Sequence, residues 1–169
     1  MVKKLILGIG QSLRGDDGAG LAVVKRWQCL FQTDAPDLCP RVELLELPGL
    51  ALLEYMGDAE QVLIVDAVRS GVAPGSLHWL REAELAEFTQ GSTSAHGWGV
   101  AETLVLGRRL TPEKMPKRVD ILGIEIGKVR MGEGLSAEVA GVINDAAQLV
   151  QRWVNEKKGQ GVKGFSQAC

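Results

Sequence analysis

Short apolar runs alternate along this chain with longer segments in which apolar residues recur every three or four positions. The runs predict buried strands, and the recurrences predict helices that cover a sheet. The run Gln-Val-Leu-Ile-Val-Asp at 61–66 is continuous and rich in β-branched residues, which is typical of a parallel strand buried on both faces. The predicted strands are 3–9, 41–47, 61–66 and 118–126, and the predicted helices are 18–31, 48–56, 97–110 and 135–156.

The segment 67–75 sets the direction of the strand that follows it. Its nine residues include two glycines and a proline and are too few for a helical crossover, so the strand expected at 76–80 runs antiparallel. A short turn of helix is expected at 82–88 and a polar loop at 90–96. Strands alternating with helices predict a three-layer α/β/α sandwich with a mostly parallel sheet and one antiparallel strand. We expect a single domain over 1–156 and a flexible tail over 157–169.

Composition narrows the classes of function. Hydrophobic residues make up 46% of the 169 positions, which suits one domain with a sizeable core. The net charge is −2 and the basic residues are scattered, so no nucleic-acid partner is expected. No apolar run reaches the roughly 20 residues that span a bilayer, and the N-terminus lacks a signal-peptide pattern. We therefore expect a cytoplasmic protein with no membrane partner.

The segment 7–20, Leu-Gly-Ile-Gly-Gln-Ser-Leu-Arg-Gly-Asp-Asp-Gly-Ala-Gly, joins the first strand to the first helix. It begins like a dinucleotide fingerprint, but Leu13 stands where the third glycine belongs. Asp16 and Asp17 would also repel a pyrophosphate at the helix N-terminus. Paired carboxylates at this place can hold a cation or move a proton. The alternative is that both aspartates only cap the helix and complement its dipole.

Two further residues are expected at the same edge, because ligands bind outside the carboxyl ends of the strands in open sheets of this kind. Asp66 ends the most apolar strand, and His96 precedes the helix expected at 97–110. A helix N-terminus disfavours the imidazolium, so a histidine there stays neutral and able to bind metal. Asp17, Asp66 and His96 together can form an open site for a transition metal. The alternatives are an Asp66 that binds loop amides and a His96 that caps a helix or lies in the core.

The sequence gives little support for hydrolysis by a serine or cysteine nucleophile. No Gly-x-Ser-x-Gly elbow is present. Cys29 falls in a predicted helix and Cys39 in a loop, so a Cys–His dyad is not favoured. The three cysteines, of which the third is Cys169, are irregularly spaced, which argues against a disulfide framework or a cysteine zinc site. His78 lies inside the strand expected at 76–80 and is interpreted as structural.

The motif Leu-Gly-Ile-Gly-x-x-Leu-x-Gly-Asp-Asp-Gly-x-Gly, the strand Leu-Ile-Val-Asp-Ala and the later Ser-x-His resemble those of the maturation endopeptidases of [NiFe] hydrogenases. The resemblance extends from Lys4 to about Trp153. It implies a twisted, mostly parallel five-stranded sheet between helices. It also implies removal of a C-terminal extension from the nickel-loaded precursor of the hydrogenase large subunit, which would be the partner of a monomeric enzyme.

The resemblance further implies that Asp17, Asp66 and His96 bind the nickel already held by the substrate, with no permanently bound cofactor. The roles of these three residues in recognition and in chemistry stay open, as does the nucleophile. Asp16 would support Asp17 by holding the backbone amides of its loop.

Two positions depart from the family pattern. Gln11 replaces a common Asn, and Glu46-Leu47-Pro48-Gly49 replaces an Asp-Gly-x-Thr motif, a change that should alter which precursor is accepted. Two other functions compete with the endopeptidase. They are a non-catalytic chaperone that checks the metal of a metalloenzyme precursor, and a nucleotide-binding α/β domain.

Overall fold

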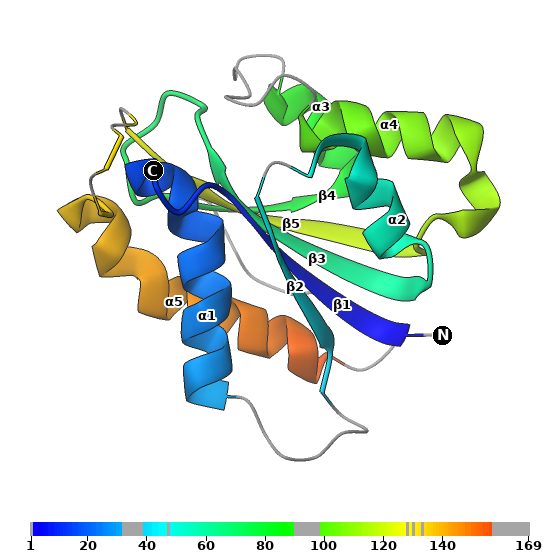
Figure 1. Cartoon of the computed structure of the whole chain (residues 1–169), viewed down its shortest axis with the longest axis horizontal. Coiled ribbons are helices and arrows are strands. Elements are labelled where there is room, and N and C mark those ends of the chain that lie inside the picture. The colour runs from blue at the N-terminus through cyan, green and yellow to red at the C-terminus, as the bar shows by residue number, and fades with distance from the viewer. Residues whose placement is uncertain are drawn as a thin grey trace.

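A computed structural model of the chain describes residues 2–31, 39–46, 48–89, 99–127, 129, 131–132 and 134–156. A central sheet lies between two layers of helices (Figure 1). In chain order the elements are β1 (Val2–Ile9), the 3-10 helix η1 (Gly15–Gly18), α1 (Ala19–Phe31), β2 (Arg41–Leu45), η2 (Gly49–Ala51), α2 (Leu52–Met56), β3 (Ala59–Val68), β4 (Leu77–Arg81), α3 (Glu82–Thr89), α4 (Val100–Leu110), η3 (Pro112–Lys114), β5 (Arg118–Glu125) and α5 (Ala137–Asn155).

The described strands form one five-stranded sheet in the order β2-β1-β3-β5-β4. The pairs β1–β2, β1–β3 and β3–β5 are parallel, whereas β4 pairs antiparallel with β5. The predicted α/β/α sandwich with one antiparallel strand is therefore confirmed. The loops that follow β1, β3 and β5 gather at one edge of this sheet, at the upper left of Figure 1.

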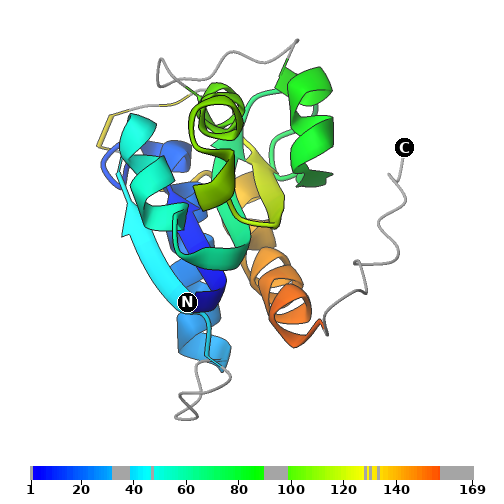
Figure 2. The ribbon, with the colours of Figure 1, turned by 90° about the vertical axis from the view of Figure 1, so that its right-hand side faces the viewer.

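Alternate residues of the central strand β3 supply the two halves of the core, as the pleat of a strand requires. Leu63 and Val65 pack with α1 and α5 on one face, and Val62 and Ile64 pack with α2, α3 and α4 on the other. Figure 2 shows α4 and α5 on opposite sides of the sheet. No helix in the described ranges is long and apolar enough to cross a membrane.

Helix α1 approaches the sheet unusually closely at Gly20. A Cβ atom there would lie 2.3 Å from the carbonyl oxygens of Ile9 and of Val65. Real side chains do not approach backbone oxygens so closely, so this position accepts only glycine. The glycine of the sequence motif thus fixes the distance between α1 and the strands that carry the candidate site.

Several predicted boundaries differ from those of the structure, and three of the differences are described here. Strand β2 ends at Leu45 instead of 47, because its partner β1 ends at Ile9, which pairs with Leu45. Strand β3 extends to Val68, which pairs with Glu125, so Asp66 lies within the strand and does not end it. The turn expected at 82–88 is the eight-residue helix α3, which begins where the backbone N–H of Arg81 donates to Glu84 (2.7 Å), half of a capping box. The predicted loop 90–96 and tail 157–169 lie outside the described residues.

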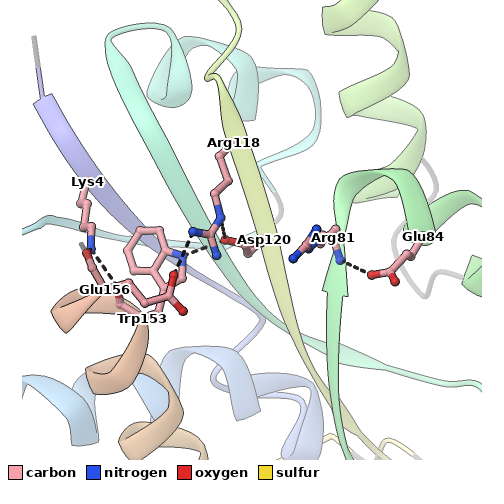
Figure 3. Close-up of polar contacts among 7 residues, drawn as sticks. All are labelled: Lys4, Arg81, Glu84, Arg118, Asp120, Trp153 and Glu156. Atoms are coloured by element: carbon pink, nitrogen blue, oxygen red, sulfur yellow. Dashed lines mark hydrogen bonds and ion pairs between the residues drawn. The ribbon is translucent and has the colours of Figure 1, made fainter. Parts of the chain in front are cut away.

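Charged side chains bind the C-terminal end of α5 at the opposite edge of the sheet (Figure 3). The ammonium of Lys4 donates to the carbonyl oxygens of Trp153, Val154 and Glu156 at 2.8–2.9 Å. The indole N–H of Trp153 donates to the buried carboxylate of Asp120 (2.8 Å), which also pairs with Arg118. Lys4 thereby caps the carbonyls that the helix terminus leaves unsatisfied. These contacts anchor α5, whose first turn lies at the candidate site.

Candidate active site

The first loop holds Asp17 in a fixed and buried position. The carbonyl oxygen of Asp17 accepts from the N–H of Gln11 (3.3 Å), and its own N–H donates to Arg14 (3.2 Å). Gly10 packs directly against this backbone, since a Cβ there would lie 2.2 Å from the carbonyl oxygen of Asp17. The residue is only 2% exposed. The loop therefore presents one ordered aspartate at the carboxyl edge of the sheet.

Asp16 links this loop to the start of α5. Its Oδ1 accepts from the N–H of Ser136 (2.6 Å), and its Oδ2 accepts from the hydroxyl of Ser136 (2.9 Å). The same serine caps α5 by accepting from Val139. The expectation that Asp16 holds the amides of its own loop is therefore wrong, because both carboxylate oxygens reach a residue 120 positions away. These bonds also do not cap α1, the helix that follows Asp16.

Asp66 lies on the face of β3 that carries Val62 and Ile64, towards α2 and α4. Its Oδ1 accepts from the N–H of Ala67 (2.8 Å). Burial raises the pKa of Asp66 to about 7, the Ala67 hydrogen bond opposes this rise, and the negative charge of Asp17 adds to it. The two carboxylates predicted to converge are thus close enough to influence each other electrostatically. A carboxyl group perturbed in this way is typical of a functional site.

The raised pKa of Asp66 gives the first testable prediction, which concerns stability. The folded state holds the proton up to about pH 7, whereas the unfolded chain releases it near its ordinary value of 3.8. The free energy of unfolding should therefore fall as pH rises between these values. Asp66→Asn removes this effect. We expect the variant to melt about 10 °C above the wild type at pH 8, with the difference fading near pH 4.

Thermal melting across that pH range measures the effect. Asp145→Asn is the matched control, because Asp145 is exposed on α5 and should show no such pH-dependent difference. A melting-temperature difference for Asp66→Asn that is the same at pH 4 and pH 8 would contradict the assignment of the raised pKa.

The third candidate, His96, lies outside the described residues. Within the described ranges, no three His, Cys, Asp or Glu side chains lie together as a metal ligand set. His78, interpreted as structural from the sequence, places its Nε2 within hydrogen-bonding distance (3.0 Å) of the buried carboxylate of Glu125, which accepts the bond. Glu125 also accepts from the N–H and hydroxyl of Ser70 and from the N–H of Gly71, at 2.8–3.0 Å. This network fixes the loop that follows Asp66.

Glu46 contacts the first loop. Its Oε1 accepts from the hydroxyl (2.7 Å) and the N–H (3.3 Å) of Ser12. These hydrogen bonds lower the pKa of Glu46. The segment that departs from the family pattern is therefore tied to the loop that carries Asp17. Sequence reasoning missed this contact, and it also missed the roles of Ser136 and Glu125.

A family model described as hydrogenase maturation protease matches residues 41–153. The chain belongs to the hydrogenase maturation protease family. It is 30% identical to the hydrogenase 2 maturation protease of Escherichia coli (strain K12) over 149 residues, covering 86% of this chain and 87% of that protein. It is 28% identical to the hydrogenase expression/formation protein HupD of Rhizobium leguminosarum bv. viciae over 152 residues, covering 88% and 72%.

The solved structure of the hydrogenase maturating endopeptidase HybD from E. coli has the same fold. It superimposes with a TM-score of 0.74 at 26% identity, covering 90% of this chain and 91% of that one. Members of the hydrogenase maturation protease family hydrolyse peptide bonds, so the sequence-based prediction of a peptide-bond hydrolase is confirmed. Asp17 and Asp66 lie at the carboxyl edge of the sheet in this protease, and their roles are addressed below.

Proposed function

We propose that this protease removes a C-terminal extension from the nickel-loaded precursor of a [NiFe] hydrogenase large subunit, using Asp17, Asp66 and His96 to recognise the nickel. The observation that carries the proposal is the position of two aspartates at the same edge of the sheet, the buried Asp17 in the first loop and Asp66 on β3, where the charge of Asp17 helps to raise the pKa of Asp66. Two carboxylates held together favour a bound cation, because the cation relieves their mutual repulsion.

The sequence position of His96 supports its place in this set. It precedes the first residue of α4, Val100, by four residues. Val100 and Ala101 pack against the core on the same face of the sheet that carries Asp66. A neutral imidazole together with two carboxylates suits a divalent first-row metal, and it leaves positions for the ligands that the precursor itself supplies. The nickel belongs to the substrate in this account.

Recognition of nickel would position the peptide that is to be cut at the candidate site. The metal, fixed in the precursor, would dock against the carboxylates and so hold the adjoining C-terminal segment at the sheet edge, converting the attack into a step within one complex. Hydrolysis adds water across the scissile amide, which gives a carboxylate on the mature subunit and an amine on the released peptide.

Cleavage is tested by incubating the protein with nickel-loaded precursor and following the precursor mass. We expect a single loss from the C-terminus, and no loss from precursor prepared without nickel. A stable complex that is never followed by cleavage would favour the metal-checking chaperone. A shift of the melting temperature by nucleotides would favour the nucleotide-binding alternative.

A further inference from the structure

Each of the four loops or segments at the carboxyl edge of the sheet exposes one large apolar side chain. Leu13 follows β1, Leu50 follows β2, Val72 follows β3 and Met131 follows β5. Their exposed fractions are 74%, 50%, 49% and 75%, and Leu13 and Met131 are the most exposed large apolar residues in the described part of the chain. We call these four residues the apolar rim.

Hydrogen bonds join the segments that carry the rim. The N–H of Gly132, next to Met131, donates to the carbonyl oxygen of Leu13 (2.9 Å). The hydroxyl of Ser12, on the other side of Leu13, donates to Glu46 (2.7 Å), which binds the first loop to the segment that leads to Leu50. The Gly132 bond joins the segment of Met131 to that of Leu13 through the backbone.

Single exposed leucines are ordinary on soluble proteins. The rim differs because it borders a functional edge and because its two central residues are joined through the backbone. Leu13 lies four positions before Asp17 in the same loop, and Asp16 ties that loop to Ser136, beyond Met131. Apolar groups gathered beside a site are typical of a surface that contacts another protein. The polypeptide that must reach Asp17 is the substrate precursor.

We propose that Leu13 and Met131 anchor the hydrogenase precursor through apolar side chains next to its C-terminal extension, an inference that rests on the proposed function. Leu13 would enter an apolar depression of the precursor, and the unbranched Met131 would adapt to the surface beside it. Leu50 and Val72 would flank the contact. Because these residues touch the substrate away from the scissile bond, they act on binding and leave the hydrolytic step unchanged.

The test uses Leu13→Ser, Met131→Gln and the double variant with nickel-loaded precursor. We expect KM for cleavage to rise about tenfold for each single change, as for other anchor residues, with kcat within about twofold of the wild type and an unchanged melting temperature. Leu110→Ser is the matched control. Leu110 is 67% exposed and ends α4, at the end of that helix away from the four segments (Figure 1). It should behave like the wild type.

An unchanged KM in the double variant, while the wild type cleaves, would overturn this inference and leave the proposed function intact. A wild type that neither binds nor cleaves the precursor would overturn both. Sedimentation of the wild type and of Leu13→Ser without precursor tests whether the apolar rim instead binds a second copy of this chain. An assembly of the wild type that the variant loses would assign the rim to a second copy of this chain and would also overturn the inference.

Discussion

Asp17→Asn should reduce processing of the nickel-loaded precursor about a thousandfold, equivalent to about 4 kcal/mol of lost transition-state stabilisation. The change keeps the shape of the side chain but removes the negative charge that acts on Asp66. Without that charge the site attracts the metal less strongly and holds the peptide less firmly. The rate of the C-terminal mass loss measures this effect.

Two controls separate a loss of activity from a loss of folding. A melting temperature near that of the wild type shows that the buried amide is accommodated. Asp145→Asn removes a carboxylate of the same size from the exposed surface of α5 and should cleave at the wild-type rate. Wild-type processing by a folded Asp17→Asn variant would remove Asp17 from the site.

Gly20→Ala should destabilise the fold by about 3 kcal/mol or more, because the new Cβ overpacks a contact that cannot relax. The Cβ would lie 2.3 Å from two backbone oxygens, on β1 and on β3, so helix and sheet would have to separate. Gly141→Ala is the opposite case. Its Cβ would meet no atom within 4 Å, and alanine in α5 should stabilise by about 1 kcal/mol.

Urea unfolding of both variants and the wild type measures these free energies. Both substitutions make the same chemical change within a helix, so their opposite signs would isolate the close approach of α1 to the sheet. A Gly20→Ala variant as stable as Gly141→Ala would contradict this account of the packing.

Periodicity in the sequence was sufficient to predict the layers of the fold. Continuous apolar runs identified the buried parallel strands, and the short 67–75 segment correctly identified the antiparallel strand, because a helical crossover needs more residues. Ends of elements were less predictable. Strand β2 ends at Leu45 because its partner β1 ends at the paired residue Ile9, and that limit depends on the folded paths of both strands.

The candidate site was predicted in part. The carboxyl ends of neighbouring parallel strands meet, so the proximity of Asp17 and Asp66 followed from topology alone. The partner of Asp16 did not follow, because Ser136 is 120 residues away and reaches it only when α5 is docked. The role of Glu125 could have been predicted from the sequence. It lies between Ile124 and Ile126 in an apolar strand, where a carboxylate requires partners.

Glu46, which lies in the segment that departs from the family pattern, contacts the loop of the candidate site. By binding Ser12, Glu46 contacts the loop that carries both Leu13 and Asp17. We therefore expect a change in this segment to affect both the apolar rim and the carboxylate site. This coupling supports the expectation that the segment influences which precursor is accepted.

The most direct test of nickel recognition compares the affinity of the protein for nickel-loaded precursor with its affinity for nickel-free precursor. The ratio is measured by titration calorimetry for the wild type and for Asp66→Asn. We predict a preference for the nickel-loaded form of at least about tenfold in the wild type, and a ratio close to one in the variant. An equal preference in both proteins would contradict the account.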